Sequence, residues 1–147
     1  MTLSRQVIRP RNPALDPSRK FALPLSPAIR GGDFVFLSGM AAIDPATGEL
    51  AHGTVAAETR QVLTNMGDLL EAAGSSLAKV VKVNVLIYSM LEYENMNSVY
   101  REFFPADPPA RTGMRRQADR RPQGRDRLHR LLERLGMSRR PTNFTTA

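Results

Sequence analysis

Few side chains in this sequence belong to the types that carry out nucleophilic or metal chemistry. The chain has no cysteine, which excludes a disulfide framework, a thiolate nucleophile and a cysteine-ligated metal. Its two histidines, His52 and His129, are too few for a histidine-rich metal site. His52 follows Leu50 and Ala51 without an Asp or Ser partner arranged around it, so we interpret it as a solvated side chain. Arg111, taken alone, is most simply a surface arginine.

The charge of the chain is divided unevenly along its length. The formal net charge is +7. Residues 1–113 hold 11 Lys and Arg and 11 Asp and Glu, whereas residues 114–147 hold 10 Arg and 3 acids. The basic character that would favour an anionic partner therefore belongs to the last 34 residues alone.

The chain has the length of one small domain. Its 147 residues suffice for one hydrophobic core, and a deep site in so small a protein can need a neighbouring subunit as a wall, which makes a homo-oligomer plausible. The longest apolar stretch, residues 80–87, is interrupted by Lys82 and Asn84 and is too short to span a membrane. Residues 1–20 lack the apolar centre of a signal peptide, so we expect a cytoplasmic protein without membrane association.

The elements that must position a site can be predicted from the hydrophobic pattern. Five prolines in residues 1–28 predict an extended, irregular lead-in without helix, and residues 34–38 predict a core strand. Thr54 as N-cap and Gly74 as the stop predict a helix between them. A strand over 79–87 and a helix over 91–104, closed by Pro105, follow. Two sets of residues define their buried faces: Val81, Val83, Val85 and Ile87 in the strand, and Met96, Tyr100 and Phe103 in the helix. The order predicts an α+β fold, a mixed sheet with both helices packed on one face.

Several stretches, in order, resemble the RidA family of imine deaminases, also described as L-PSP endoribonucleases or translation inhibitors. They lie within residues 21–113 and read LPLSPAIRGGDFVFLSGM at 23–40, DPATGEL at 44–50, ETRQVLTNMGDLLEAAGSSLAKVVKVNVLI at 58–87, MNSVYREFFP at 96–105 and PPART at 108–112. The resemblance implies a chorismate-mutase-like subunit that forms homotrimers with substrate clefts between subunits. It implies hydrolysis of reactive 2-imino and 2-enamino acids, such as 2-iminopropanoate, to 2-keto acids and ammonia, without a cofactor or metal.

The resemblance also assigns roles to individual residues. Arg111 is the arginine of the Pro-Ala-Arg motif, whose planar guanidinium would pair with the substrate carboxylate and fix the imine carbon for attack by water. Asn97 matches a cleft asparagine, and Ser38 and Gly39 match a strand end that lines the cleft. Ser26 stands where many relatives read Gly-Pro-Tyr-Ser, but Leu23-Pro24-Leu25 here removes the glycine and the tyrosine. For Asn97 the alternative is an exposed helix residue, and for Ser38 and Gly39 it is a turn that ends the strand.

The tail, residues 114–147, departs from the family. Relatives continue after Pro-Ala-Arg-Thr with an apolar strand and a last strand of the type Val-Glu-Ile-Asp-Cys-Ile-Ala-Tyr, whose glutamate is a candidate for activating water. We expect neither strand here, but a basic segment that is disordered or forms a short helix with a stripe of leucines. The domains are thus predicted as 1–113, RidA-like, and 114–147, a non-family tail. Neither Asp126 nor Glu133 has the strand context of that glutamate.

A frameshift would explain the tail. Residues 124–131, Gly-Arg-Asp-Arg-Leu-His-Arg-Leu, can be encoded by codons that, read from their second base, spell Val-Glu-Ile-Asp-Cys-Ile-Ala-Tyr. We therefore hypothesise a frameshift near Gly113, natural or introduced in sequencing. The printed chain would then be destabilised and impaired in activity.

Three functions compete. The first is an imine and enamine deaminase that acts on intermediates released by pyridoxal-phosphate-dependent dehydratases. The second is a non-catalytic binding member that keeps the cleft and lacks the water-activating glutamate. The third, which we rank lowest, is RNA binding or endoribonuclease activity by the arginine-rich tail. The neutral body and the lack of aromatic residues in the tail before Phe144 speak against it.

Overall fold

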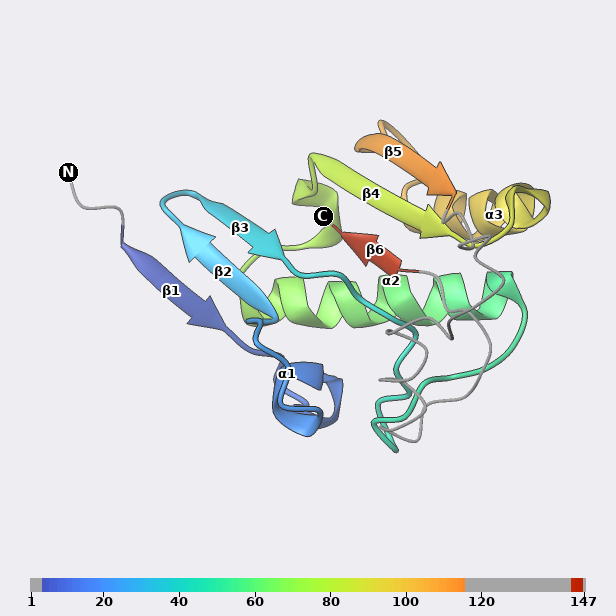
Figure 1. Cartoon of the computed structure of the whole chain (residues 1–147). Coiled ribbons are helices and arrows are strands. Elements are labelled where there is room, and N and C mark those ends of the chain that lie inside the picture. Colours follow the sequence, from blue (N-terminus) through green and yellow to red (C-terminus); the bar gives the residue numbers. More distant parts are fainter. Residues whose placement is uncertain (1–3, 116–143, 147) are drawn as a thin grey trace, which may run out of the picture.

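A computed structural model describes residues 4–115 and 144–146 of the chain, the last three by their backbone. One antiparallel sheet has the order β1-β2-β3, and the second has the order β5-β4-β6 (Figure 1). The strands are β1 (Arg5–Ile8), β2 (Ala28–Gly31), β3 (Phe34–Leu37), β4 (Lys82–Ile87), β5 (Ala110–Arg115) and β6 (Phe144–Thr146). The helices are α1 (Pro17–Lys20), α2 (Val55–Ala72) and α3 (Tyr93–Phe103), with 3-10 turns η1 (Pro13–Leu15), η2 (Leu77–Lys79) and η3 (Met90–Glu92).

A single core joins both sheets to the long helices. Its buried members come from β1, β2 and β3, from α2, from β4 and from α3. On α2 the buried side chains recur at three- and four-residue steps, as the sequence predicted. The fold is therefore the expected mixed α+β arrangement, with α2 beneath both sheets and α3 packed on α2 (Figure 1).

The ends of α2 are set by the residues that the sequence indicated. The Thr54 hydroxyl accepts a hydrogen bond from the Ala57 backbone N–H at 3.2 Å, which satisfies one of the unpaired donors of the first turn. Gly74 follows the helix with φ of +70°, a conformation that glycine adopts without steric cost.

The first 28 residues contain more regular structure than predicted. The expectation that prolines exclude helix there is wrong, because Pro17 occupies the first position of α1, where a missing N–H and a fixed φ are tolerated. Asp16 caps this turn by accepting from the backbone N–H groups of Ser18 and Arg19, and it forms an ion pair with Arg9 at 2.7 Å. Strand β1 also lies in this segment, and β2 begins at its last residue, Ala28.

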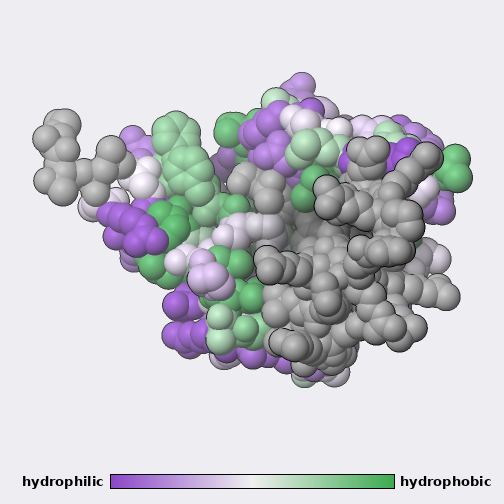
Figure 2. All heavy atoms as spheres, in the orientation of Figure 1, coloured by the Kyte–Doolittle hydropathy of each residue, from purple (hydrophilic) through white to green (hydrophobic). Residues whose placement is uncertain are grey.

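The strand predicted in the core at 34–38 has one buried face and one exposed face. Leu37 of β3 is buried, but the side chains of Phe34 and Phe36 are 64% and 60% exposed. Successive side chains of a strand alternate between its faces, and only one face of β3 contacts the core. Figure 2 accordingly shows apolar atoms at the surface over the β2–β3 hairpin.

The expectation that no strand follows the Pro-Ala-Arg motif also requires correction. Strand β5 begins within the motif at Ala110 and runs to Arg115, two residues beyond the predicted domain limit, because parallel pairing with β4 supplies partners for its backbone. Strand β6 is three residues long and antiparallel to β4. The predicted leucine-striped helix and the acids Asp126 and Glu133 lie outside the described residues. No helix of the described part is long and apolar enough to cross a membrane.

Candidate active site

Arg111 is held between two aromatic rings of α3. Its guanidinium carbon lies 4.6 Å from the centroid of the Tyr100 ring and 5.5 Å from that of Tyr93. Its Nη2 donates a hydrogen bond to the Tyr93 hydroxyl at 3.1 Å, and its Nη1 lies 3.9 Å from the Met96 sulfur. Cation–π contacts on two sides and a hydrogen bond leave this side chain little rotational freedom. We call Arg111, Tyr93 and Tyr100 the arginine clamp.

The local fold explains the clamp. Strand β4, helix α3 and strand β5 form a strand–helix–strand unit with parallel strands, in which Arg111 pairs in register with Val83 and Gly113 with Val85. Val83 and Val85 are buried against the helices, so Arg111 and Gly113 lie on that same face of the sheet.

Gly113 permits the close approach of Tyr93. A Cβ atom at Gly113 would lie only 3.2 Å from the Cε2 and hydroxyl oxygen atoms of Tyr93. On α3, Tyr93 and Tyr100 are seven residues apart, about two helical turns, which places both rings on the face that meets β5. The missing side chain of Gly113 is therefore part of the geometry that fixes Arg111.

Two buried polar groups of α3 lack partners beside the clamp. Asn97 donates from Nδ2 to Glu94 at 3.3 Å, but its Oδ1 has no hydrogen-bond partner among the described residues, and neither has the Tyr100 hydroxyl. Burial raises the pKa of Tyr100 and outweighs the opposing effect of the positive charge of Arg111, so the phenol stays protonated at neutral pH. Unpaired buried polar groups cost free energy and call for an explanation.

The guanidinium of Arg111 faces no carboxylate within the described part of the chain. Helix α3 carries two carboxylates: Glu94 is paired with Arg101 at 2.7 Å, and Glu102 is paired with Arg60. The hydrogen bond from Arg101 and a second one from Asn97 lower the pKa of Glu94. An oriented arginine without an acidic partner suits the binding of an anionic group such as a carboxylate.

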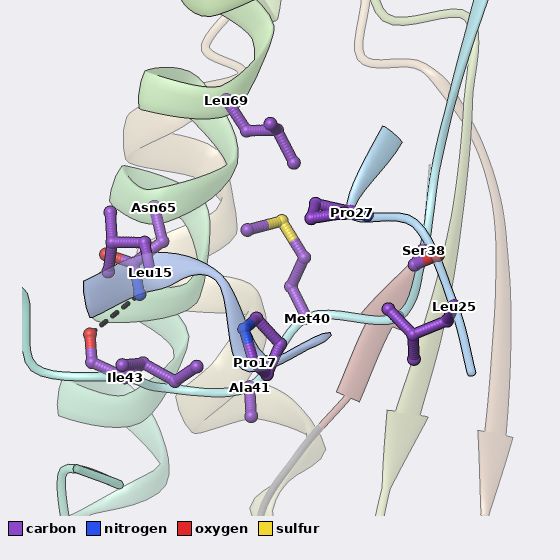
Figure 3. Close-up of a pocket in the computed structure, with 11 residues that line it drawn as sticks. Leu15, Pro17, Leu25, Pro27, Ser38, Met40, Ala41, Ile43, Asn65 and Leu69 are labelled. Atoms are coloured by element: carbon purple, nitrogen blue, oxygen red, sulfur yellow. Dashed lines mark hydrogen bonds between the residues drawn. The ribbon is translucent and has the colours of Figure 1, made fainter. Parts of the chain in front are cut away.

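The other predicted site residues gather elsewhere in the chain. The Ser38 hydroxyl donates to the Ser26 carbonyl oxygen at 2.6 Å, and Gly39 follows at the end of β3. Ser38 and Gly39 line a small pocket (Figure 3). In the wall of this pocket, the Asn65 side-chain amide donates a hydrogen bond to the Ile43 carbonyl oxygen at 2.8 Å. The pocket's cavity volume of about 20 Å³ has room for about one water molecule, and its lining carries no charged residue. Within the described residues, no hydrogen bond or ring contact joins this group to Arg111.

His52 is exposed, in agreement with its interpretation as a solvated side chain. Among residues 4–115, no three His, Cys, Asp or Glu side chains are grouped in a way that would hold a metal ion.

Tyr93 and Gly113 were not singled out from the sequence. A signal for Tyr93 exists in the spacing Tyr93, Asn97, Tyr100, whose steps of four and three residues mark one face of a helix. Gly113 has no comparable signal, because its role depends on which ring lies above it in the folded chain.

Comparisons with known proteins identify the family. A family model described as Endoribonuclease L-PSP matches residues 18–118. A RutC family protein of Pyrococcus horikoshii is 46% identical over 91 residues, which cover 62% of this chain and 72% of that protein. A Bos taurus protein named 2-iminobutanoate/2-iminopropanoate deaminase is 40% identical over 88 residues, 60% of this chain and 64% of the relative.

Solved structures give the same answer for the fold. A putative endoribonuclease from Thermotoga maritima is 32% identical with a TM-score of 0.72, covering 97% of this chain and 94% of that chain. RidA from an Antarctic Psychrobacter is 27% identical with a TM-score of 0.70, covering 96% of this chain and 95% of that chain. The motif, the fold and these likenesses agree, and the chain belongs to the RidA family, whose family model bears the description Endoribonuclease L-PSP.

Proposed function

We propose that this protein hydrolyses 2-imino acids and their enamine tautomers, of which 2-iminopropanoate is an example, to 2-keto acids and ammonia. The observation that carries the proposal is the arginine clamp: a guanidinium fixed by two tyrosines and without an acidic partner in the described part. Relatives named 2-iminobutanoate/2-iminopropanoate deaminase support the same substrate class.

In the proposed reaction, Arg111 pairs through two N–H groups with the substrate carboxylate. This pairing orients the neighbouring C2 atom for attack by water, so part of the barrier is removed by positioning. Water adds to C2 of the protonated imine to give a carbinolamine, the C–N bond then breaks, and the nitrogen leaves as ammonium while the oxygen remains as the keto group. The reaction needs no redox step.

Asn97 is proposed to bind the substrate as well. Its buried Oδ1 lacks a donor, and the N–H of a protonated imine could supply one. Among the described residues, no hydrogen bond joins Ser26, Ser38 or Gly39 to Arg111. We therefore propose that a neighbouring copy in a homotrimer brings such a segment to the clamp, as the family resemblance implies.

A second candidate is binding without rapid turnover. It is favoured by the absence, within the described residues, of a carboxylate free to activate water beside Arg111, since Glu94 is paired with Arg101. In that case the chain would bind 2-imino or 2-keto acids by the same contacts and release them unchanged.

The test separates these candidates. The imine is generated in the assay from alanine by an amino-acid oxidase, and formation of the keto acid is compared with spontaneous hydrolysis, while binding of pyruvate is followed by calorimetry. The parent should accelerate hydrolysis, and Arg111→Ala should lower kcat/KM by about 100-fold. Arg115→Ala, which removes an exposed arginine from the same strand, is the matched control and should behave as the parent.

Each alternative result has a distinct meaning. Pyruvate binding that depends on Arg111, without acceleration by the parent, would establish the binding function instead of the deaminase. Equal activity of Arg111→Ala and the parent would overturn the assignment of the site.

A further inference from the structure

The two sheets are separated by a groove between β3 and the beginning of β4. Its cavity volume is about 420 Å³, and its walls are β3 on one side and residues 79–82 on the other. The floor is formed by Leu70 of α2 and by Ala73, the residue that follows the helix, together with Leu37, and all three are buried. The residues that line this groove include none of the arginine clamp, which lies on the β5 side of β4.

The directions of the strands beside the groove suit the addition of one β-strand. Strands β3 and β4 point in the same direction, and β6 points in the opposite one (Figure 1). β6 pairs with β4 from Leu86 to Asn84, and the groove lies beside the neighbouring residues 79–82. A strand there would be antiparallel to both neighbours.

Backbone groups for such a strand are available on both walls. β3 pairs with β2 on one side, and among the described residues no strand pairs with its other side. On the β4 wall, the pairing with β6 ends at Asn84. The Lys79 and Val80 N–H groups and the Val81 carbonyl oxygen already form hydrogen bonds, so Lys82 is the residue of this wall whose backbone remains for a new strand. Unpaired strand edges are templates for the addition of another strand.

Apolar side chains around the groove lack the neighbours that a strand would supply. Val81 has the same strand phase as the buried Val83 and Val85 and was expected on the buried face, but it is 71% exposed. Phe34 and Phe36, on the opposite wall, are more than half exposed. Apolar surface of this kind on a sheet edge marks an interaction site.

The charges of the groove favour an acidic occupant. Its lining has three basic residues, Arg30, Lys79 and Lys82, and one acidic residue, Asp33. Arg30 donates to the Ala73 carbonyl oxygen and Lys82 to the Thr112 hydroxyl at 2.7 Å, so these hydrogen bonds leave both positive charges uncompensated. Complementary charge adds to affinity and to the rate of association.

We propose that this groove binds an extended, acidic peptide segment of a partner by strand addition. The segment runs antiparallel to β3 and β4, forms backbone hydrogen bonds with both, and directs alternate apolar side chains toward α2. The proposal is independent of the deaminase activity, because none of its residues belongs to the arginine clamp.

The first experiment uses a fluorescein-labelled peptide, Val-Glu-Val-Thr-Val-Glu-Val, and the full chain. Binding is measured by fluorescence anisotropy. A peptide methylated on alternate backbone nitrogens keeps the side chains but loses the hydrogen bonds of one edge, and its affinity should fall at least about tenfold. A version with Lys in place of Glu should bind several-fold more weakly, and the difference should shrink at about 1 M salt. Equal affinity of the methylated peptide would overturn strand addition.

Variants of the chain locate the binding. Val81→Asp places a negative charge where an apolar contact with an acidic peptide is proposed and should weaken binding about tenfold or more. Leu91→Asp is the matched control, since Leu91 is 93% exposed and does not line the groove, and its affinity should equal that of the parent. Equal weakening by both variants would contradict the proposed location.

Hydrogen exchange of the backbone amides gives a second readout. Addition of the peptide should slow exchange on both walls, in residues 34–37 and at Lys82, whereas the Lys79 and Val80 amides are already hydrogen-bonded in the free protein. Amides of β3 that face the groove and are already protected in the free protein, at every protein concentration, would show that the chain itself fills the groove. Protection that grows with protein concentration would show that a second copy fills it. Either result would overturn the proposed peptide partner.

Discussion

The two sides of β4 are built in different ways. On the β5 side, the arginine clamp comes from a contiguous segment, β4 to α3 to β5, spanning residues 82–115. On the other side, the junction with β3 depends on β6, which is only three residues long and far away in the sequence. A local strand–helix–strand unit holds its geometry by itself, whereas a junction between distant segments needs every strand in place. The arginine clamp can therefore keep its geometry while the sheets β1-β2-β3 and β5-β4-β6 remain separate.

The largest effect expected from this comparison is a difference in stability between two valines of the same stretch. Val83 is fully buried and Val81 is 71% exposed. Val83→Ala should lower the free energy of unfolding by about 2 kcal/mol, because buried methyl groups are lost and a cavity remains. Val81→Ala should change it by less than about 0.5 kcal/mol. Urea denaturation of both variants gives the comparison.

The same pair also tests whether the groove is open. If Val81→Ala were as destabilising as Val83→Ala, Val81 would have to be covered in solution, and the sheet would not be divided as described. The slope of the denaturation curve should remain that of the parent in both variants.

The next effect concerns the clamp. Gly113→Ala places a methyl group 3.2 Å from Tyr93 and should displace that ring from Arg111. We expect KM for the imine to rise about tenfold with a smaller change in kcat, because the misplaced guanidinium binds the carboxylate poorly. Met114→Ala, at the exposed neighbouring position, is the control. An unchanged KM in Gly113→Ala would show that the position of Tyr93 does not govern Arg111.

A smaller change should follow from the loss of one hydrogen bond. Tyr93→Phe keeps the ring against Arg111 and removes the hydroxyl that accepts from its Nη2 at 3.1 Å. KM should rise about threefold, within the range of a single hydrogen bond to a charged group that can be replaced in part by water. Tyr100→Phe is the internal control, since the Tyr100 hydroxyl has no partner in the described structure and its removal should not raise KM. A rise of equal size in both variants would argue against a specific role for the Tyr93 hydroxyl.

Sequence reasoning succeeded where local signals and tertiary packing agree. The N-cap Thr54 and the turn glycine Gly74 determine the ends of α2, and the β-branched residues Val83 and Val85 mark the buried face of β4. The ends of α2 and the buried face of β4 can both be predicted from residues that are close together in the sequence.

The failures depend on partners that lie far apart in the chain. Val81 is exposed because no described residue lies between β3 and β4 beside it, and Phe34 and Phe36 are exposed because they lie on the face of β3 turned away from the core. Hydrophobicity alone reveals neither. The helix α1 was missed because Pro17 was taken as a helix breaker, although Asp16 before it supplies a cap. Arg111 and Asn97 were named as candidates from the sequence, and the helical spacing places Tyr93 and Tyr100 on one face, but their contact with Arg111 follows only from the packing of α3 against β5.

The smallest expected effect is a pH dependence of the free energy of unfolding, arising in the half of the molecule that contains the sheet β1-β2-β3. Asp16 is buried next to α1; burial opposes its ionisation, but hydrogen bonds from Ser18, Arg9 and Arg19 outweigh it, so its pKa lies below the ordinary value. The unfolded state therefore binds a proton more readily than the folded state, and stability is lost as pH falls below about 4 through the folded-state pKa. Asp16→Asn keeps a capping side chain and should flatten this dependence, whereas Asp68→Asn, on the exposed side of α2, should not. Urea denaturation between about pH 6 and pH 2.5 measures the slopes. If Asp16→Asn kept the full slope of the parent, the acid sensitivity would have to come from carboxylates elsewhere, and the first sheet would not be the part of the fold that acid weakens.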